Sequence, residues 1–376
     1  MSRPVQGSAQ RRDLRVALSC KTVENGQGRD GIGVYTAALA KHLPGAGIEV
    51  IEFALGQTSA AMPDMRLDSY AAHVARDFVG LKSPLELPAH IVHFTDHHIV
   101  PSRLPTVATL HDAVPLKYPE WVSPRMRWLK NLIMKRMARH ADQVVAVSHF
   151  AVEELVEYFG VARDRIAVVH GGIDEYWLQP PAEPLAVVTA PDGRILKDYF
   201  LCVGTFQPRK NFDNLISAHL ALPQATRHEH PLVIVGRPGW RCEHTIKRLQ
   251  SLAAAGEPVY WLSDVNSRQD LRAVYGSALA LSFVSLYEGF GIPVLEAFAT
   301  GTPVITSTAS SLPEVAGDAA VKVAPQDVQA IADAMLSIAS SSALRTDLVA
   351  RGHTRVREFT WEQGARKMAK VYARLR

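Results

Sequence analysis

Two glutamates, Glu288 and Glu296, lie eight positions apart in a glycine-rich stretch of the sequence. Pro293 suits the first turn of a helix, so we expect Glu288 in the loop before that helix and Glu296 in its opening turns. Carboxylates placed there can accept hydrogen bonds from ligand hydroxyls, and Gly289 and Gly291 would leave the backbone open to the same ligand. For Glu296 alone, a favourable interaction with the helix dipole is the alternative explanation.

Two adjacent cations, Arg209 and Lys210, follow an apolar run and stand just before Asn211, where a helix is expected to begin. Positive charge at a helix N-terminus opposes the helix dipole and is unfavourable unless an anion lies against it. A diphosphate would fit, because Arg209 can bind two oxygens and Lys210 can act as a point charge. Two solvated charges on a loop are the alternative.

Four glycines lie in the loop expected after the first strand, at positions 26, 28, 31 and 33. The first three match the G-x-G-x-x-G pattern of dinucleotide-binding folds, but the pattern begins several residues beyond the strand, which weakens the match. Backbone amides at Gly31 and Gly33, at the start of a helix, could still approach an anion closely. A structural turn is the alternative.

Short apolar runs alternate with amphipathic segments, and these elements must hold the loops in place. In the first half we expect strands at residues 14–19, 48–55, 91–94, 106–110, 144–147 and 166–169, and helices at 32–43, 127–140 and 149–159, the last with Glu153, Glu154 and Glu157 on its outer face. In the second half we expect strands at 199–203, 232–235, 259–262, 278–283 and 304–306, and helices at 211–222, 245–254, 268–275, 293–299, 328–340, 343–358 and 361–375. Strands joined by helical crossovers predict parallel sheets in an α/β protein.

A proline-rich segment without helical periodicity separates the two series. We therefore expect a disordered lead-in at residues 1–12, an N-terminal domain at 13–178, a linker at 179–197, a C-terminal domain at 198–358 and a final helix at 359–376. Ligands of doubly wound sheets bind at the carboxyl ends of the strands. The expected site is therefore a central cleft between two Rossmann-like domains.

The composition of the 376 residues is that of a globular protein, with 47% hydrophobic and 21% charged residues. The net charge of +4 suits an anionic ligand and does not require nucleic acid. Cys20, Cys202 and Cys242 are too far apart in sequence for a disulfide framework or a zinc knuckle, which favours a reducing cytoplasm. The longest uncharged apolar stretch, residues 273–287, is shorter than the ~20 residues that span a membrane.

Four histidines, at positions 90, 93, 97 and 98, suggest metal binding by their density. No cysteine is near them and the segment runs into a loop that ends at Pro101, which favours a loop lining the acceptor side of the cleft.

Residues 125–140 carry six cations and no acidic residue. Met126, Leu129, Ile133 and Met137 would form one apolar stripe of a helix there. Such a helix can lie on an anionic membrane, or its stripe can pack on the sheet while the cations stay solvated.

The stretch from Tyr287 to Ser307 resembles the E-x7-E region of the retaining family 4 glycosyltransferases, which have the GT-B fold. Further segments resemble the same family in the same order: residues 31–33, 111–112, 209–211, 300–306, 312–317 and 359–361. The resemblance covers nearly the whole chain after residue 14.

The resemblance implies a role for each matching residue. Catalytic roles are implied for Glu288, His111, Arg209 and Lys210, with Asp112 as a second-rank candidate. Donor or nucleotide binding is implied for Gly31, Gly33, Arg209, Lys210, Val265, Glu288, Gly289, Phe290, Gly291 and Glu296. In this scheme Glu288 contacts sugar hydroxyls, Glu296 holds the ribose, and the two cations neutralise the leaving diphosphate, so that no metal is needed.

We therefore expect a cytoplasmic transferase, peripheral at the inner membrane face, that moves mannose from GDP-mannose to a lipid-linked saccharide. The overall resemblance is to bacterial mannosyltransferases of surface-polysaccharide assembly. A UDP-sugar donor and a small sucrose- or trehalose-type acceptor remain alternatives. An NAD-dependent dehydrogenase would leave Glu288, Glu296 and Arg209–Lys210 unexplained, and a non-catalytic family member would show damaged motifs.

Overall fold

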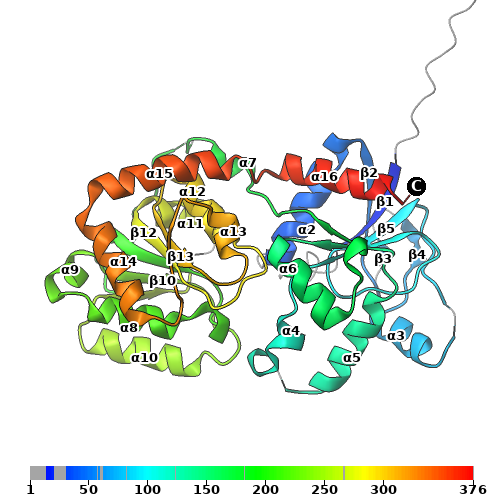
Figure 1. Ribbon diagram of the computed structural model, residues 1–376, viewed down its shortest axis with the longest axis horizontal. Coiled ribbons are helices and arrows are strands. Elements are labelled where there is room, and N and C mark those ends of the chain that lie inside the picture. Colours follow the sequence, from blue (N-terminus) through cyan, green and yellow to red (C-terminus); the bar gives the residue numbers. More distant parts are fainter. Residues whose placement is uncertain are drawn as a thin grey trace, which may run out of the picture.

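A computed structural model of the chain describes residues 14–20, 31–56, 58–59, 62–81, 83–122, 124–181, 183–265 and 267–375 (Figure 1). Within these residues the chain forms two parallel six-stranded sheets, each with helices around it. The α/β class and the paired series of strands expected from the sequence are confirmed. The glycines at positions 26 and 28 lie outside the described residues.

The first sheet has the strand order β2-β1-β5-β6-β7-β8. Its strands are β1 (Leu14–Ser19), β2 (Ile48–Phe53), β5 (Ile91–Phe94), β6 (Thr106–Leu110), β7 (Gln143–Ala146) and β8 (Ile166–Val168). The order reverses between β1 and β5. A two-stranded antiparallel hairpin, β3 (Thr58–Ser59) with β4 (Met62–Arg66), was not expected from the sequence.

The helices that accompany the first sheet are α2 (Gly31–His42), α3 (Tyr70–Phe78), α4 (Val114–Lys117), α5 (Arg127–Ala138) and α6 (His149–Glu154). Helix α7 (Glu175–Leu178) follows them in the chain but packs against α12 (Ile292–Ala299) of the second domain. The apolar stripe of α2 explains its place, because Tyr35, Leu39 and Leu43 are all buried. Helix α3 was not expected from the sequence. Its N-cap residue is Ser69, whose hydroxyl accepts from the amide of Ala72.

The second sheet has the order β11-β10-β9-β12-β13-β14. Its strands are β9 (Tyr199–Val203), β10 (Leu232–Val235), β11 (Val259–Leu262), β12 (Ala278–Phe283), β13 (Val304–Ser307) and β14 (Val321–Val323). Its helices are α8 (Phe212–Ala221), α9 (Gln224–Glu229), α10 (Glu243–Ala254), α11 (Arg268–Gly276), α12 (Ile292–Ala299), α13 (Leu312–Ala316), α14 (Val328–Ser340) and α15 (Ser342–Val356). The order reverses between β9 and β12.

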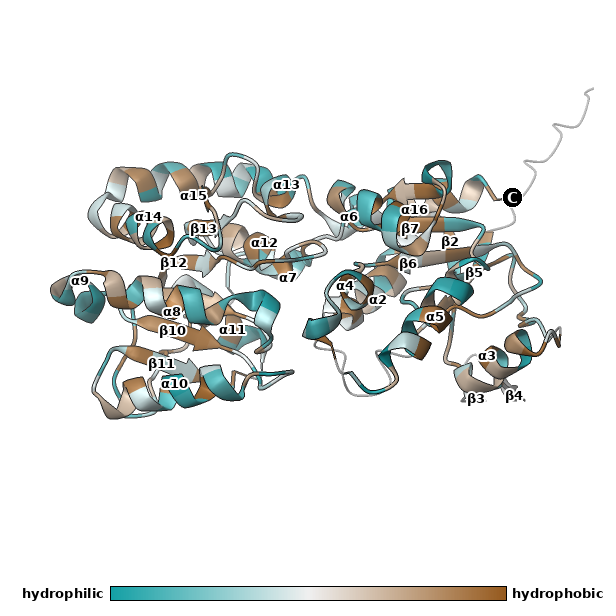
Figure 2. Ribbon diagram, turned by 60° about the horizontal axis from the view of Figure 1, so that its bottom comes forward, coloured by the Kyte–Doolittle hydropathy of each residue, from teal (hydrophilic) through white to brown (hydrophobic). Residues whose placement is uncertain are grey.

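The cores lie on both faces of each sheet, which is why the strands are nearly continuous apolar runs. Figure 2 shows the hydrophobic strands inside and the hydrophilic residues on the outer sides of the helices. The last helix, α16 (Trp361–Ala373), returns to the first sheet and lies against α2 (Figure 1). There the Tyr372 hydroxyl lies 2.7 Å from Nδ1 of His93. The exact bounds of the linker between the domains stay a prediction.

The helix expected at residues 149–159 differs from that expectation in its shape and in the burial of one residue. The α-helical part ends at Glu154, and residues 155–159 form a π-helical turn that ends at Gly160 in the left-handed region. Glu154, expected on the outer face, is 3% exposed. The expectation was wrong because partners far away in the sequence cover this carboxylate.

Candidate active site

The loops after β9 and β12 meet where the order of the second sheet reverses. At such a point the connections that follow the two neighbouring parallel strands run in opposite directions. They leave a crevice beyond the carboxyl ends of the strands, where ligands bind in doubly wound folds. The amide of Leu286 donates to the carbonyl of Arg209 over 2.8 Å and joins the two loops. The topology therefore brings the two cations of the first loop to the glutamate of the second.

Glu288 forms ion pairs with both cations. Arg209 Nη1 lies 2.6 Å from Glu288 Oε2, and Lys210 Nζ lies 2.6 Å from Glu288 Oε1. The side chains of Glu288 and Lys210 are buried, and that of Arg209 is 22% exposed. The carboxylate is therefore the anion that the sequence requires beside two cations before a helix.

Burial acts against each of these charges, and their mutual attraction decides the outcome. Burial raises the pKa of Glu288, but the charges of Arg209 and Lys210 outweigh this effect and lower it to about 2. Burial lowers the pKa of Lys210 below its usual value, and the Glu288 carboxylate only partly compensates. Glu288 is thus ionised throughout the physiological range and holds both cations without a ligand.

The cation loop is held in place by an unusual backbone conformation. Asn211, just before α8, has a φ of 62°, and its side-chain amide donates to the carbonyls of Val284 and Pro325. Asn tolerates the left-handed region better than most residues. A side chain at Gly204 would lie 3.3 Å from Lys210 Cε, so the absence of one leaves room for the lysine stem.

Two serines that the sequence analysis missed support the glutamate loop. The amide of Glu288 donates to Ser310 Oγ, and Ser311 Oγ donates to the carbonyls of Glu288 and Phe290. Ser311 is buried, so these bonds are shielded from water. No spacing in the sequence could have indicated them, because they follow β13 and meet the loop only through the sheet order.

His111 and Asp112, which follow β6 of the first sheet, come next to Gly289. A side chain at Gly289 would approach the carbonyl oxygen of His111 to 2.4 Å, so only glycine permits this contact. His111 Nε2 lies 2.9 Å from the carbonyl of Thr95, and the Tyr35 ring of α2 meets the His111 ring edge-on at 4.9 Å. The structure thus joins His111 and Asp112 to the glutamate loop, and sets helix α2, which begins at Gly31 and includes Gly33, beside His111.

Glu296 lies at the start of the second turn of α12 and is half-buried. The Tyr275 hydroxyl donates to its Oε2 over 2.7 Å. Burial raises the pKa of Glu296 to about 7, although the hydrogen bond from Tyr275 lowers it in part. The structure therefore gives the two glutamates opposite electrostatic environments.

Three other candidates lie elsewhere in the fold or have a structural role. Val265 follows β11, the edge strand, and packs against the hydrophobic core. The Phe290 side chain packs on His170 and Phe359 at the junction between the sheets, so only its backbone is available to a ligand. Gly291, with a φ of 124°, begins α12.

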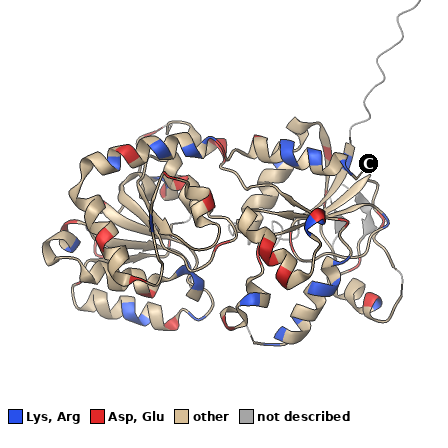
Figure 3. Cartoon of the chain, in the orientation of Figure 1, with Lys and Arg blue, Asp and Glu red and all other residues tan. Residues whose placement is uncertain are grey.

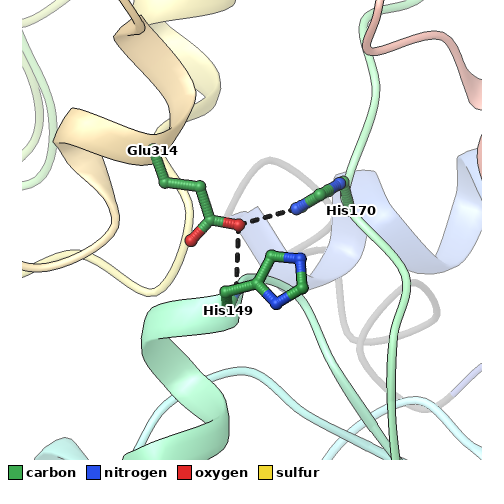
Figure 4. A group of neighbouring side chains, drawn as sticks. All are labelled: His149, His170 and Glu314. Carbon is green, nitrogen blue, oxygen red and sulfur yellow. Dashed lines mark hydrogen bonds and ion pairs between the residues drawn. The ribbon is translucent and has the colours of Figure 1, made fainter.

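Glu314 of α13 links the two domains (Figure 4). Its Oε1 accepts from the backbone amide of His149 and lies 2.7 Å from His170 Nε2, and its Oε2 accepts from the amide of Phe150. The ligand atoms of His149, His170 and Glu314 lie within 4.8 Å of one another and could hold a cation. Three N–H donors already satisfy the carboxylate, so the group is explained as a hydrogen-bonded cap on α6.

The four histidines at positions 90, 93, 97 and 98 lie in separate environments. His90 Nδ1 accepts from the amide of Arg15, and His93 lies between Tyr372 and Thr109. His98 pairs with Asp96 over 2.8 Å. Burial lowers the pKa of His97 to about 4, with His111 and Asp112 near enough to influence it. The segment therefore lies beside the first-domain part of the site.

Of the apolar stripe expected along residues 125–140, Ile133 and Met137 meet the core, which agrees with the alternative that the stripe packs on the sheet, whereas Met126 does not. Met137 is buried, Ile133 packs against the core, and Met126 is exposed. The exposed stripe of α5 instead contains Trp128, Leu132, Lys135 and Arg139, and the basic residues are visible along the helix in Figure 3. Trp128 is 73% exposed and Leu132 is 46% exposed. Among the described residues, no helix is long and apolar enough to cross a membrane.

Comparisons with known proteins agree with this architecture. Residues 29–176 match the family model described as Glycosyltransferase Family 4, and residues 196–355 match the model described as Glycosyl transferases group 1. The sucrose-phosphate synthase of Thermosynechococcus elongatus superposes with a TM-score of 0.69 at 21% identity, over 96% of this chain and 99% of that one. The GT-B fold implied by the resemblance is confirmed.

Two curated relatives are mannosyltransferases of Escherichia coli. The O-antigen chain mannosyltransferase B is 32% identical over 278 residues, which cover 73% of this chain and 71% of that protein. The serotype-specific mannosyltransferase WbdA is 29% identical over 275 residues, which cover 72% of this chain but only 33% of that protein. The dehydrogenase alternative is therefore wrong, and the chain belongs to family 4 of the glycosyltransferases.

Proposed function

We propose that the protein is a retaining transferase that moves mannose from GDP-mannose to a lipid-linked saccharide in polysaccharide biosynthesis. The observation that carries this proposal is the group formed by Arg209, Lys210 and Glu288 at the switch point of the second sheet, next to His111. The names of two relatives support mannose as the sugar. A UDP-sugar donor is the alternative, because no residue described above selects the base.

Sugar transfer breaks the bond between the sugar C1 and the diphosphate oxygen, so negative charge develops on the leaving diphosphate. Arg209 and Lys210 stand where they can neutralise that charge, and fixed cations stabilise the transition state because they need no reorganisation. Glu288 would then exchange part of its contact with the cations for hydrogen bonds from sugar hydroxyls. Two protein cations supply the charge that a divalent metal supplies elsewhere, so we propose a metal-independent reaction.

The acceptor hydroxyl would enter from the side of His111 and Asp112, which the first sheet supplies. In a retaining reaction without a protein nucleophile, the new bond forms on the face that the diphosphate leaves. The leaving phosphate oxygen then accepts the proton of the acceptor hydroxyl. Glu296 and the loop of Val265 would hold the ribose and the base, and Gly31 and Gly33 would lie near the phosphates.

Calorimetric titration with GDP, UDP, ADP and NAD in the presence of EDTA tests the donor. We expect GDP to bind most tightly and without metal, and the Arg209→Ala/Lys210→Ala variant to lose most of that affinity. Preference for UDP would replace the proposed donor but keep the site. Unchanged GDP binding by the double variant would contradict the proposed diphosphate contacts.

We also propose that the protein acts at the cytoplasmic face of a membrane. The exposed stripe of α5 combines Trp128 and Leu132 with Lys135 and Arg139, the pairing of apolar and basic side chains that binds anionic lipid surfaces. A lipid-linked acceptor would be presented at such a surface.

A further inference from the structure

The second domain contacts one short helix of the first domain, α6, at both of its ends. Ser148, the N-cap residue of α6, donates from Oγ to the carbonyl of Gly289 over 2.8 Å. At the other end, Glu154 accepts a hydrogen bond from the Tyr287 hydroxyl. Tyr287 and Gly289 are the two neighbours of Glu288 in the sequence. The glutamate loop is therefore attached to the first domain on both sides of its central residue.

Tyr287, a residue of the second domain, contacts residues of both domains. Its ring is buried and meets the rings of Tyr118 and Phe150 edge-on, each at 5.6 Å between centroids. Its hydroxyl also accepts from the amide of Ala113, two residues after His111. Its carbonyl accepts from Arg209 Nη1 over 3.1 Å. The backbone of Tyr287 thus contacts Arg209 within the second domain, while its hydroxyl contacts the first domain.

Glu154 is a buried carboxylate that the proposed chemistry does not use. Lys117 of α4 donates to its Oε1 over 2.7 Å, and Tyr287 donates to Oε2. A buried charge costs free energy unless it is paired and hydrogen-bonded, and here both oxygens have partners. A hydrogen bond to an ionised acceptor is stronger than one between neutral groups. The tyrosine hydroxyl is thus bound to an acceptor that α4 and α6 hold rigidly.

We propose that Tyr287 and Glu154 are positioning residues, which fix Glu288 relative to His111 when the two domains are together. This inference rests on the proposed function of Glu288 in sugar transfer. Arg209, Lys210 and Glu288 remain in contact within the second domain whether or not this bond forms. The bond between Tyr287 and Glu154 fixes the position of these three residues relative to His111 on the acceptor side. Its loss therefore slows transfer and leaves nucleotide binding in place.

Tyr287→Phe removes the hydroxyl and keeps the ring contacts. We expect kcat for transfer to fall roughly tenfold, the loss that one hydrogen bond to a charged group can produce, while the Kd for the nucleotide stays within about twofold. Glu154→Gln should cause a similar loss. Because Glu154→Gln acts on transfer through its bond to the Tyr287 hydroxyl, the double variant should be little worse than Tyr287→Phe alone.

Tyr199→Phe is the matched control. Tyr199 is buried in β9, and its hydroxyl donates to the carbonyl of Val274 in α11 over 2.6 Å rather than to the first domain. It should lower the thermal stability and leave kcat near the wild-type value. An equal loss of kcat in Tyr199→Phe and Tyr287→Phe, or additive losses in the Tyr287→Phe/Glu154→Gln variant, would overturn the proposal.

Amide hydrogen exchange of the full chain without ligand tests the contact independently of the sugar. Tyr287→Phe should speed exchange in peptides that cover residues 113–118 and 285–291, and Tyr199→Phe should not. Unchanged exchange in Tyr287→Phe would contradict the positioning role even if the enzyme is active. A wild-type protein that transfers none of the tested sugars would instead refute the proposed function, while faster exchange in the variant would still support the contact.

Discussion

The two glutamates of the E-x7-E spacing occupy opposite chemical environments although they lie on neighbouring elements. The pKa of Glu288 is low because the charges of two cations outweigh the effect of burial. The pKa of Glu296 is raised to about 7 because burial outweighs the hydrogen bond from the Tyr275 hydroxyl. The identities of both residues were predictable from the sequence. Their charges were not, because they depend on Arg209 in the loop after β9 and on Tyr275 of α11, which the fold brings to them.

Glu288→Gln removes the charge of Glu288 and keeps its size. Transfer should fall at least ~10²-fold, because the sugar loses a charged hydrogen-bond acceptor in the transition state. GDP should bind at least as tightly as it binds to the wild type, since Arg209 and Lys210 no longer have a competing carboxylate. Enzyme assays and calorimetry on the same preparation check both expectations, and turnover near the wild-type rate would contradict the assignment.

Glu296→Gln should change how stability depends on pH. The pKa of Glu296 is about 7 in the folded protein, above its usual value of 4.5, so folding takes up a proton between these pH values. The wild type therefore loses stability as pH rises from about 5 to 7, and the neutral variant does not. The difference in unfolding free energy should grow in favour of the variant by about 2 kcal/mol. Urea unfolding at pH 5, 6, 7 and 8 measures this difference, and a constant value would refute the expectation.

At the scale of elements, strands were predicted better than exposed faces. The strands at residues 199–203 and 278–283 have the expected bounds, because a strand buried on both faces is a continuous apolar run. The inward stripe of α5 was predicted, because Ile133 and Met137 meet the core, but the exposed pair Trp128 and Leu132 was not. A helix with apolar residues on several sides does not show from its sequence which of them meet the sheet. Glu154 was misplaced for a related reason, because its cover comes from Tyr287, 133 residues away.

The exposed stripe of α5 should mediate binding to anionic vesicles. Lys135→Glu/Arg139→Glu should weaken co-sedimentation with phosphatidylglycerol vesicles at least tenfold, because each basic residue near such a surface contributes about 1 kcal/mol. Trp128→Ser/Leu132→Ser should weaken it as well, through lost apolar insertion. Ile195→Ser, which removes another exposed apolar side chain, is the control and should bind as the wild type does. Binding by the charge-reversed variant equal to that of the wild type would contradict the proposal.

At the scale of the whole molecule, the sequence predicted two sheets and a returning helix but not how closely they are joined. The ordered motifs were sufficient for the family, and two of them, residues 111–112 after β6 and 209–211 after β9, lie beyond the carboxyl end of a strand. The contacts between the domains were not predictable. They depend on atoms such as the carbonyl of His111, to which Gly289 must come close, and on Glu314, which reaches the first turn of α6.

The chain passes between the domains twice, and the two passages lie side by side. The amide of Ile173, on the outward passage, donates to the carbonyl of Phe359, on the return, over 2.8 Å. Beyond that point Trp361 packs on Tyr35, and α16 is buried against α2. Cutting the backbone within residues 179–197 would therefore not release two independent halves. The C-terminal fragment would keep its own helix docked on the N-terminal fragment, so a nicked protein would behave as one particle.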